Sequence, residues 1–233
     1  MKNFFSRFKF FVVERKTLFL IFVLVVVLVG IAVLPSAFAS SPSNKLRIVV
    51  DAGHGGIDGG CEGSREGSNE RELNLLYAKT LKTYLESYGI EVVLTRSTTD
   101  GLYSALASNK KKDDMKKRKE IIEKANADLI VSLHMNAFPQ KSARGAQVYY
   151  NPESEVSKSL ATAIQSSFKK DLPSAKSVPA VGDYYILNCT NTPAVIVECG
   201  FLSNDEEEIL LLSSTYRDKV CYSILCGIVK YLE

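Results

Sequence analysis

Short apolar segments typical of β-strands alternate with longer segments of helical periodicity along most of this chain. The longer segments place apolar residues three and four positions apart, as amphipathic helices do, for example over residues 70–88 and 154–172. Strands that alternate with helices are typical of α/β proteins, in which helices cover a largely parallel sheet. We therefore predict an α/β fold, a single layered domain with a mostly parallel central sheet flanked by helices on both faces. The strand-like segments are KLRIVVDAG (45–53), IEVVLTR (90–96), DLIVSLH (128–134), GAQVYY (145–150), DYYIL (183–187) and TPAVIVECG (192–200).

The N-terminal segment differs in composition from the rest and is set aside from the fold. Five bases surround a single acid and precede an uncharged apolar run over residues 17–34, which is followed by the small-x-small pattern AFA. This arrangement indicates either a cleaved signal peptide or a retained membrane anchor, and the sequence leaves both open. We predict residues 1–39 as this segment, 40–44 as a linker and 45–233 as the folded domain. The domain is expected to be exported across the cytoplasmic membrane and to contact the membrane only through the N-terminal segment.

The folded domain carries almost no net charge. Removing the five bases and one acid of the N-terminal segment from totals of 29 Lys and Arg and 26 Asp and Glu leaves 24 and 25. Nucleic-acid binding usually depends on an excess of basic side chains, so we expect no nucleic-acid partner. The five cysteines show no C-x-x-C spacing, which argues against a zinc knuckle or a thioredoxin-like motif.

Two helical segments carry specific local signals. Asn69 can cap the helix that follows it, with Glu72 three residues later in a capping-box arrangement, and Gly89 can end that helix in a left-handed conformation. The mixed-charge stretch over residues 110–120 is predicted as a solvated loop that leads into a helix through residues 118–127.

Three strand-like segments end in side chains that bind metals or carry protons. The only two histidines, His54 and His134, follow the first of these segments and close the third, and Glu198 lies near the end of the last. Glu70 begins the helix after the first strand. Ligands of open α/β sheets bind outside the carboxyl ends of the strands, so we expect these four residues to meet there. Two imidazoles and one carboxylate form a ligand set of catalytic zinc sites, which leave one position for water or substrate.

Each of these residues also has a purely structural interpretation. A histidine at a strand end can be a hydrogen-bonded structural residue, Glu70 can favour the positive end of its helix, and Glu198 can be a surface acid. The last interpretation is weak, because mostly apolar residues precede Glu198 and near-buried acids usually have a partner or a function. The glycines around His54 would allow a sharp turn and the close approach of a bulky ligand.

Six stretches of the domain follow one another in a characteristic order: VVDAGHGGIDGGCEG, NERELNL, LTR, ANADLIVSLHMNA, AVIVECGFLSN and the closing YRDKVCYSILCGIVKYLE. Together they resemble successive motifs of the zinc-dependent N-acetylmuramoyl-L-alanine amidases, which are peptidoglycan hydrolases. The resemblance covers nearly all of residues 45–233, in order and at ordinary spacing. It implies a single α/β catalytic domain, one zinc ion per chain, and a peptidoglycan glycan strand with its stem peptide as substrate.

The resemblance assigns roles to the residues that match the family's motifs. The family's zinc ligands correspond to His54, Glu70 and His134, and its catalytic glutamate corresponds to Glu198. The ligand glutamate of the family lies in a pattern like E-K-x-x-N-L, which ERELNL fills here with Arg in place of Lys, so that Glu72 is left to the helix cap. The bond to be cleaved would join the lactyl group of N-acetylmuramic acid to the L-alanine of the stem peptide.

A narrower resemblance concerns the subtype. The compact domain behind an N-terminal signal or anchor, together with the stretch KKKDDMKKRKEII (110–122), is similar to the spore-cortex amidases, whose product leads to muramic δ-lactam. The alternative is a general vegetative cell-wall amidase. The expected place of action is accordingly the cell wall or the spore cortex space. The sequence identifies no regulatory partner protein but is compatible with one.

Two other function classes are open at this point. A cysteine hydrolase would use Cys199 with a histidine, but Cys199 follows Glu198 on a strand and would point to the opposite face. A non-catalytic wall-binding domain would keep the fold while losing ligands or the base, and none of the four residues is lost. Asp51 is a candidate hydrogen-bond partner for the His54 ring. Asn136 has three alternative roles, which are to hold substrate, to orient a metal ligand or to be purely structural.

Overall fold

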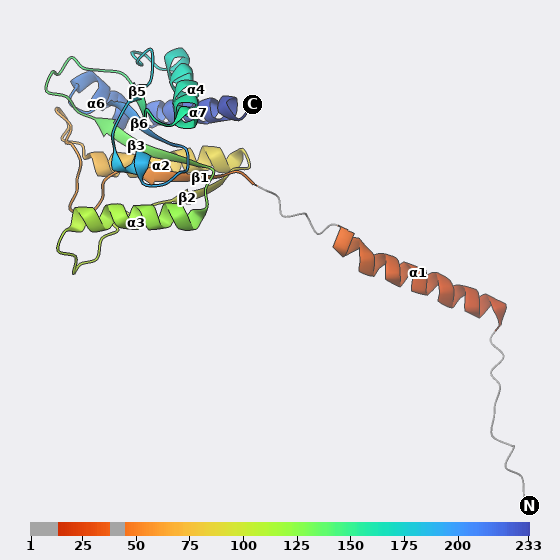
Figure 1. The fold of residues 1–233 in the computed structure, drawn as a ribbon. Coiled ribbons are helices and arrows are strands. Elements are labelled where there is room, and N and C mark those ends of the chain that lie inside the picture. Colours follow the sequence, from red (N-terminus) through yellow and green to blue (C-terminus); the bar gives the residue numbers. More distant parts are fainter. Residues whose placement is uncertain (1–13, 38–44) are drawn as a thin grey trace, which may run out of the picture. The chain divides into compact units, whose positions relative to one another are not determined.

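The computed structural model describes residues 14–37 and 45–233, with only the backbone of residues 27–37, and divides the chain into two separate units, 1–44 and 45–233. In the first unit, helix α1 runs over Arg15–Ala37 (Figure 1). Among the residues that the structure describes, no helix combines the length and the apolar character needed to cross a bilayer. The predicted start of the signal or anchor (1–13) and the predicted linker lie outside the described residues.

The second unit is built on a six-stranded sheet in the order β2-β1-β3-β6-β4-β5 (Figure 1). Neighbouring strands are parallel except for the antiparallel pair β4 and β6, so the prediction of a mostly parallel sheet is confirmed. The strands are β1 (Arg47–Ala52), β2 (Glu91–Leu94), β3 (Leu129–Asn136), β4 (Gln147–Tyr150), β5 (Ala180–Val181) and β6 (Ala194–Phe201).

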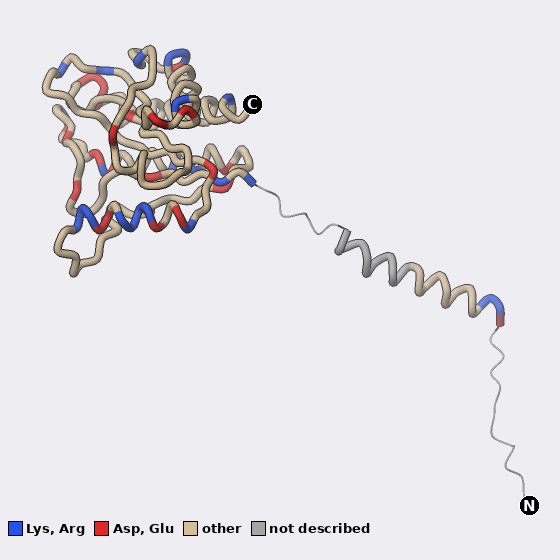
Figure 2. The backbone as a smooth tube through the Cα atoms, viewed as in Figure 1, with Lys and Arg blue, Asp and Glu red and all other residues tan. Residues whose placement is uncertain are grey.

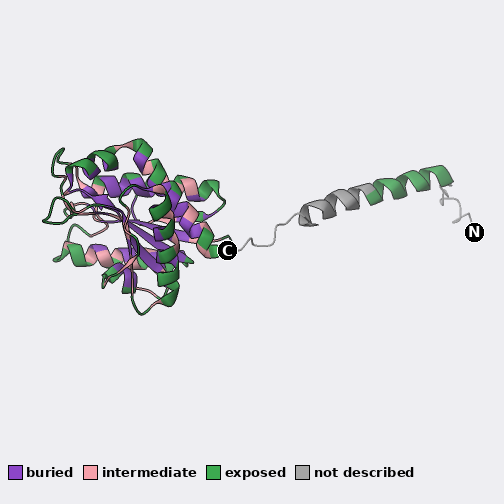
Figure 3. Ribbon diagram, turned by 90° about the horizontal axis from the view of Figure 1, so that it is seen from above, coloured by how far each residue is buried: buried purple, intermediate pink, exposed green. Residues whose placement is uncertain are grey.

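Helices cover both faces of this sheet, as predicted. The larger core packs α2, α4, α6 and α7 against one face, through side chains such as Leu81, Ile164 and Ile224. The smaller core packs α3 and α5 against the other face, through Ile122 and Ile186. Figure 3 shows the strands and the inward sides of these helices as buried. The helices are α2 (Glu70–Ser87), α3 (Lys110–Ala125), α4 (Glu155–Asp171), α5 (Tyr185–Asn188), α6 (Asp205–Leu212) and α7 (Ser214–Leu232).

The helix that carries Glu70 has the caps that the sequence predicts, with one exception. The Asn69 side chain accepts a hydrogen bond from the Arg71 backbone N–H, and Gly89 has a φ of 86° just after the helix. The second half of the capping box is absent from the described hydrogen bonds. Glu72 instead points outward, with one carboxylate oxygen 3.8 Å from Arg71 Nη2.

The prediction of a loop over residues 110–120 is wrong. Helix α3 begins at Lys110, where the side chain of Asn109 accepts the N–H of Lys112 and caps the helix. Its inward face carries Asp114 and Arg118, four residues apart and joined by a 2.7 Å ion pair, in addition to apolar side chains. A buried charged pair does not register in a hydrophobic pattern, and this hid the first half of the helix.

The prediction of a strand over residues 183–187 is also wrong. The short edge strand β5 comes before it, and the chain then turns into the single-turn helix α5. Ile186 and Leu187 are adjacent in sequence and both buried in the smaller core, which a strand with alternating faces would not allow. An apolar run this short does not distinguish a strand from a helical turn.

Candidate functional site

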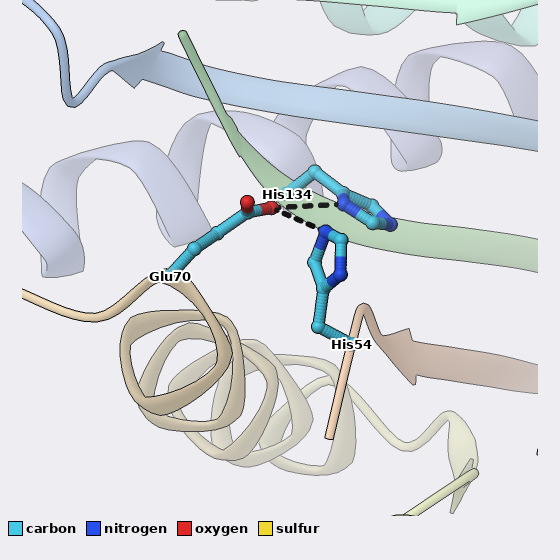
Figure 4. A group of neighbouring side chains, drawn as sticks. All are labelled: His54, Glu70 and His134. Carbon is cyan, nitrogen blue, oxygen red and sulfur yellow. Dashed lines mark hydrogen bonds and ion pairs between the residues drawn. The ribbon is translucent and has the colours of Figure 1, made fainter. Parts of the chain in front are cut away.

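His54, Glu70 and His134 converge at one point, at the carboxyl ends of β1 and β3. Oε1 of Glu70 lies 3.1 Å from Nε2 of His54 and 3.0 Å from Nδ1 of His134 (Figure 4). One potential ligand atom from each residue lies within 4.8 Å of the other two. Two imidazole nitrogens and a carboxylate oxygen at this spacing can hold a metal ion, and the donor types suit zinc.

The fold brings these residues together from three separate elements. His54 lies two residues beyond the end of β1, Glu70 is the first residue of α2, and His134 lies within β3. The adjacent strand β6 places Glu198 directly beside His134 in the sheet register. Both β3 and β6 run past these residues, with a register irregularity between His134 and Asn136, so the strands end slightly later than the sequence suggests.

Two glycines make room for the ligand side chains. A Cβ atom on Gly53 would lie 2.2 Å from Nε2 of His134, and one on Gly60 would lie 2.3 Å from Oε2 of Glu70. Gly60 also has a left-handed backbone with a φ of 71°. The glycine-rich loop therefore allows the sharp turn expected from the sequence, and it leaves room for the side chains of His134 and Glu70.

His54 itself has a left-handed backbone, with a φ of 61°, which is uncommon for a residue with a side chain. Two buried arginines hold the carbonyl groups around it. Arg118 donates to the carbonyls of Ala52 and His54, and Arg96 donates to those of Ala52 and Gly53 at 2.9 and 2.8 Å. Such contacts fix a backbone conformation that would otherwise cost of order 1–3 kcal/mol.

Asp51 does not contact the His54 ring, so that expectation is wrong. Its carboxylate is buried and binds Arg118 Nη1 at 2.5 Å, the Ser132 hydroxyl at 2.5 Å and the Thr95 hydroxyl at 2.7 Å. Burial alone would raise the pKa of Asp51, but Arg118 and the two hydroxyl groups outweigh it and lower the pKa to about 2. Asp51 thus stays ionised and acts on His54 only through Arg118.

The group beside the outer nitrogen of His54 is Asp58, which the sequence analysis did not single out. Asp58 Oδ1 lies 3.0 Å from His54 Nδ1, although the contact is too bent to count as a hydrogen bond. A carboxylate in this position favours a proton on Nδ1 and leaves Nε2 available as a ligand. The aspartate that ends the loop sequence HGGID was the one sequence signal that could have indicated this contact.

The electrostatics of the three converging side chains favour an ionised carboxylate. Burial alone would raise the pKa of Glu70, but hydrogen bonds to His134 and His54 hold it far below its usual range. Burial alone would lower the pKa of His54, but Glu70 and Asp58 raise it. Glu70 is therefore ionised, which is the form in which a carboxylate binds a metal ion.

Glu198 differs from the other acids of the site. Its Oε2 atom is buried and accepts no hydrogen bond from any residue that the structure describes. Burial, assisted by the nearby Glu70 carboxylate, raises the pKa of Glu198 to about 7, although the two histidines oppose the shift. A carboxyl group with a pKa near neutrality can both accept and release a proton at working pH.

These side chains line a pocket of about 450 Å³ between the sheet edge and helices α3 and α5. Glu198, Glu70 and both histidines lie on its wall, and Asn136 does too. The exposed residues among those that line it include Ile57, Lys111, Tyr184 and Tyr185. The pocket is large enough to receive part of an extended substrate next to the candidate metal ligands.

Cys199 is fully buried in the larger core, on the face of β6 away from Glu198. Burial raises the pKa of its thiol well above the usual value, and no histidine is beside it among the described residues. A cysteine nucleophile needs an accessible thiolate, so this position does not support a cysteine hydrolase.

A family model described as N-acetylmuramoyl-L-alanine amidase matches residues 48–230. The protein belongs to this amidase family. The germination-specific N-acetylmuramoyl-L-alanine amidase of Bacillus subtilis is 32% identical to it over 196 residues, which cover 82% of each chain. The amidase AmiA of Escherichia coli is 29% identical over 242 residues, covering 84% of this chain and 79% of AmiA.

Solved structures agree with this membership. The CwlD amidase from Clostridioides difficile, solved in complex with the GerS lipoprotein, matches with a TM-score of 0.77 and 38% identity, over 81% of this chain and 98% of that one. The family and fold predicted from the sequence are therefore confirmed. The amidase is a hydrolase of peptidoglycan that acts on the amide between N-acetylmuramic acid and L-alanine.

Proposed function

We propose that this amidase works with one zinc ion held by His54, Glu70 and His134, and that Glu198 is its catalytic proton carrier. The proposal rests on Glu70 Oε1, which lies within 3.1 Å of one ring nitrogen of each histidine. Glu198 lies beside His134 in the same pocket. The donor set matches that of catalytic zinc sites, which use three protein ligands. A zinc ion bound there would supply Lewis acidity, polarising the substrate carbonyl and making an attacking water more acidic.

Glu198 would perform the proton transfers of the hydrolysis. Its carboxylate accepts a proton from the attacking water as the C–O bond forms, and donates that proton to the nitrogen as the C–N bond breaks. A pKa raised by burial suits a group that must do both in one turnover. The products are a free lactyl carboxylate on the glycan and a stem peptide with a free alanine amine.

The remaining residues of the site would hold this arrangement in place. Arg118 and Arg96 fix the loop that presents His54, and Gly53 leaves space for the His134 ring. Asp58 orients the His54 ring, so that Nε2 faces the ion. These groups act on geometry and do not touch the reacting atoms.

The biological setting that we favour is the spore cortex, where the product leads to muramic δ-lactam. Support comes from the likeness to the germination-specific amidase of Bacillus subtilis, which extends over most of both chains. The LytC amidase of the same species is also 32% identical, but the matched region covers only 35% of that protein. A vegetative wall amidase is the second candidate.

Export places the enzyme on the side of the membrane where peptidoglycan lies. The basic and apolar sequence of residues 1–39 supports a signal peptide or an anchor, followed by a linker over residues 40–44 and the catalytic domain over 45–233. The CwlD amidase forms a complex with a lipoprotein, and by analogy a regulatory partner protein is proposed here too.

The enzymatic test is digestion of purified peptidoglycan, with mass spectrometry of the products. The expected products are intact stem peptides that begin with L-alanine. A chelator should abolish their release, and one equivalent of zinc should restore it. Cleavage at another bond, or full activity after removal of all metal, would contradict the proposal.

The biological test is the cortex of spores from a strain that lacks the gene. Loss of muramic δ-lactam, restored by the wild-type gene but not by a Glu198→Gln variant, is expected. A normal lactam content together with altered turnover of the vegetative wall would favour the second candidate.

A further inference from the structure

A second cleft adjoins the catalytic pocket. It has a volume of about 820 Å³, and Lys111, Met115 and Tyr185 line both it and the pocket. Nothing in the chemistry at His54, Glu70, His134 and Glu198 requires this second space. It lies along the first turns of α3, which Figure 2 shows as a succession of basic and acidic residues.

The second cleft has an excess of positive charge. Lys111, Lys112 and Lys116 line it, whereas Asp113 is its only acidic lining residue among those that the structure describes. Asp113 is already engaged, because its carboxylate accepts the N–H of Ser104 at 2.7 Å. The lysine side chains are exposed, so they can reach an anion that enters the cleft.

In the catalytic pocket, by contrast, acidic lining residues (Asp51, Asp58, Glu70, Asp114 and Glu198) outnumber Lys111 and Arg118. Its other basic lining residue, Arg118, is only 2% exposed and is committed to Asp51 and Asp114. Lys111, at the shared wall, is therefore the accessible basic group of the pocket as described, with Asp58 as a partner at 3.3 Å. The positive potential available to a substrate thus lies on the α3 side.

Helix stability does not account for the lysines in the first turn of α3. Lys116 differs, because its ammonium group lies 3.8 Å from Glu120 four residues later. Positive charges in the first turn of a helix oppose its dipole, and each costs about 0.3–1 kcal/mol at low ionic strength. Lys110, Lys111 and Lys112 occupy that turn, and Asp113 is its only acid. A local rule broken next to a catalytic pocket points to a function. Lys110 turns aside, with its ammonium group 5.5 Å from the centre of the Tyr103 ring.

We propose that this cleft, defined by Lys111, Lys112 and Lys116, binds the free carboxylates of the stem peptide that lie beyond its first alanine. The inference rests on the proposed function, because it starts from a scissile amide placed beside Glu198. That amide has an uncharged sugar chain on one side and an acidic peptide on the other. The positive cleft therefore sets the direction of the substrate, with the peptide toward α3 and the glycan away from it.

The test compares two substrates and two variants of the zinc-loaded full-length protein. The substrates are muramoyl peptides whose stem carboxylates are either free or amidated. The Lys112→Gln/Lys116→Gln double variant removes two charges from the cleft but leaves Lys111, which contacts Asp58, in place. The control, Lys119→Gln, removes a charge from the same helix at a residue that lines neither cavity and pairs with Glu123 at 3.6 Å.

For the double variant, kcat/KM on the free-carboxylate substrate should fall roughly 3- to 10-fold, a modest loss because exposed ion pairs are individually weak. The fall on the amidated substrate should be less than about twofold, and the control should match wild type on both. For the wild type, raising the salt concentration should reduce the difference in kcat/KM between the two substrates. Equal losses on both substrates, or no loss on either, would overturn the inference.

A binding measurement keeps this test separate from the proposed function. Labelled free stem peptide and its amidated form are titrated against the wild type and the same variants, with no turnover required. Tighter binding of the free-carboxylate peptide by wild type, lost in the double variant, supports the cleft even if the cleaved bond is not the predicted one. Equal binding of the two peptides by an active enzyme rejects the cleft and leaves the amidase chemistry intact.

Discussion

Arg118 joins Asp51 to His54. Its Nη1 atom lies 2.5 Å from Oδ1 of Asp51, while its Nη2 atom donates to the backbone carbonyl of His54. A fully buried ion pair in the smaller core is thereby connected to a candidate zinc ligand with a left-handed backbone. The stability of this face of the domain and the geometry of the metal site therefore depend on the same guanidinium group.

Replacing Arg118 with lysine should weaken both properties. An ammonium group cannot bind Asp51 and two carbonyl groups in the planar arrangement of a guanidinium, so His54 loses its support. We expect roughly tenfold weaker zinc binding and a loss of a few kcal/mol in the free energy of unfolding. The measurements are zinc competition with a chromophoric chelator and denaturant unfolding.

Arg47→Lys is the matched control for that variant. Arg47 also binds a backbone carbonyl and a carboxylate, those of Ala125 and Glu91, but at the opposite end of β1. The zinc affinity of the Arg47→Lys variant should equal that of wild type. If Arg118→Lys also bound zinc normally, the support assigned to Arg118 would be absent.

Gly53→Ala tests the space reserved for His134. The added Cβ would lie 2.2 Å from Cε1 and Nε2 of that ring and would displace it. We expect loss of stoichiometric zinc and of activity in a protein that still folds. Gly67→Ala, whose Cβ would meet no atom within 4 Å, should lose only the about 1–2 kcal/mol of a strained left-handed backbone and should keep its zinc. Normal zinc content in the Gly53 variant would count against the site as described.

The two acids in the first turn of α2, Glu70 and Glu72, should have different effects on zinc binding when they are replaced. Glu70→Ala should remove zinc and activity, because only the two imidazoles would remain as ligands. Glu72→Ala should retain both, with a stability change below about 1 kcal/mol, because its one ion pair is exposed and long. Zinc analysis of both variants decides the matter, and the opposite pattern would assign the ligand to Glu72.

The acid stability of the metal-free protein should depend on Asp51. Its pKa is about 2 in the folded state against 3.8 as the ordinary value. A depressed folded-state pKa contributes stability that is complete above the unfolded value and is lost as the pH falls from about 4 through 2. The contribution is about 2 kcal/mol. The difference in unfolding free energy between wild type and Asp51→Asn should therefore shrink by that amount over this range. A difference that stays constant with pH would reject the assignment.

Much of this architecture could be predicted from the sequence. The alternating strand and helix patterns predicted the layered α/β fold. The rule that ligands bind at strand ends predicted that His54 and His134 lie close together. Both predictions were possible because they depend on local periodicity. The start of α3 was missed, because its inward face uses the Asp114–Arg118 pair where a hydrophobic residue was expected. The segment 183–187 was expected to be a strand and forms a helical turn instead. An apolar run of four or five residues is compatible with either structure, so the sequence could not distinguish them.

The supporting contacts of the site were harder to predict. Asp51 was expected at the His54 ring, but its true partners Arg118 and Thr95 come from elements 67 and 44 residues away in sequence. A single sequence contains no signal for such pairings. Asp58 was within reach, as it lies four residues after His54, but a loop aspartate is common and does not by itself indicate a role.

The Glu198→Gln variant tests the proton transfer assigned to Glu198. Glutamine keeps the size of the side chain but cannot accept a proton at neutral pH. Zinc content, melting temperature and release of stem peptide from peptidoglycan are to be measured on one preparation. We expect stoichiometric zinc, a melting temperature no lower than that of wild type, and hydrolysis slowed by about 10²- to 10⁴-fold. Loss of zinc together with activity would make Glu198 a ligand, and turnover near the wild-type rate would contradict its role as the proton carrier.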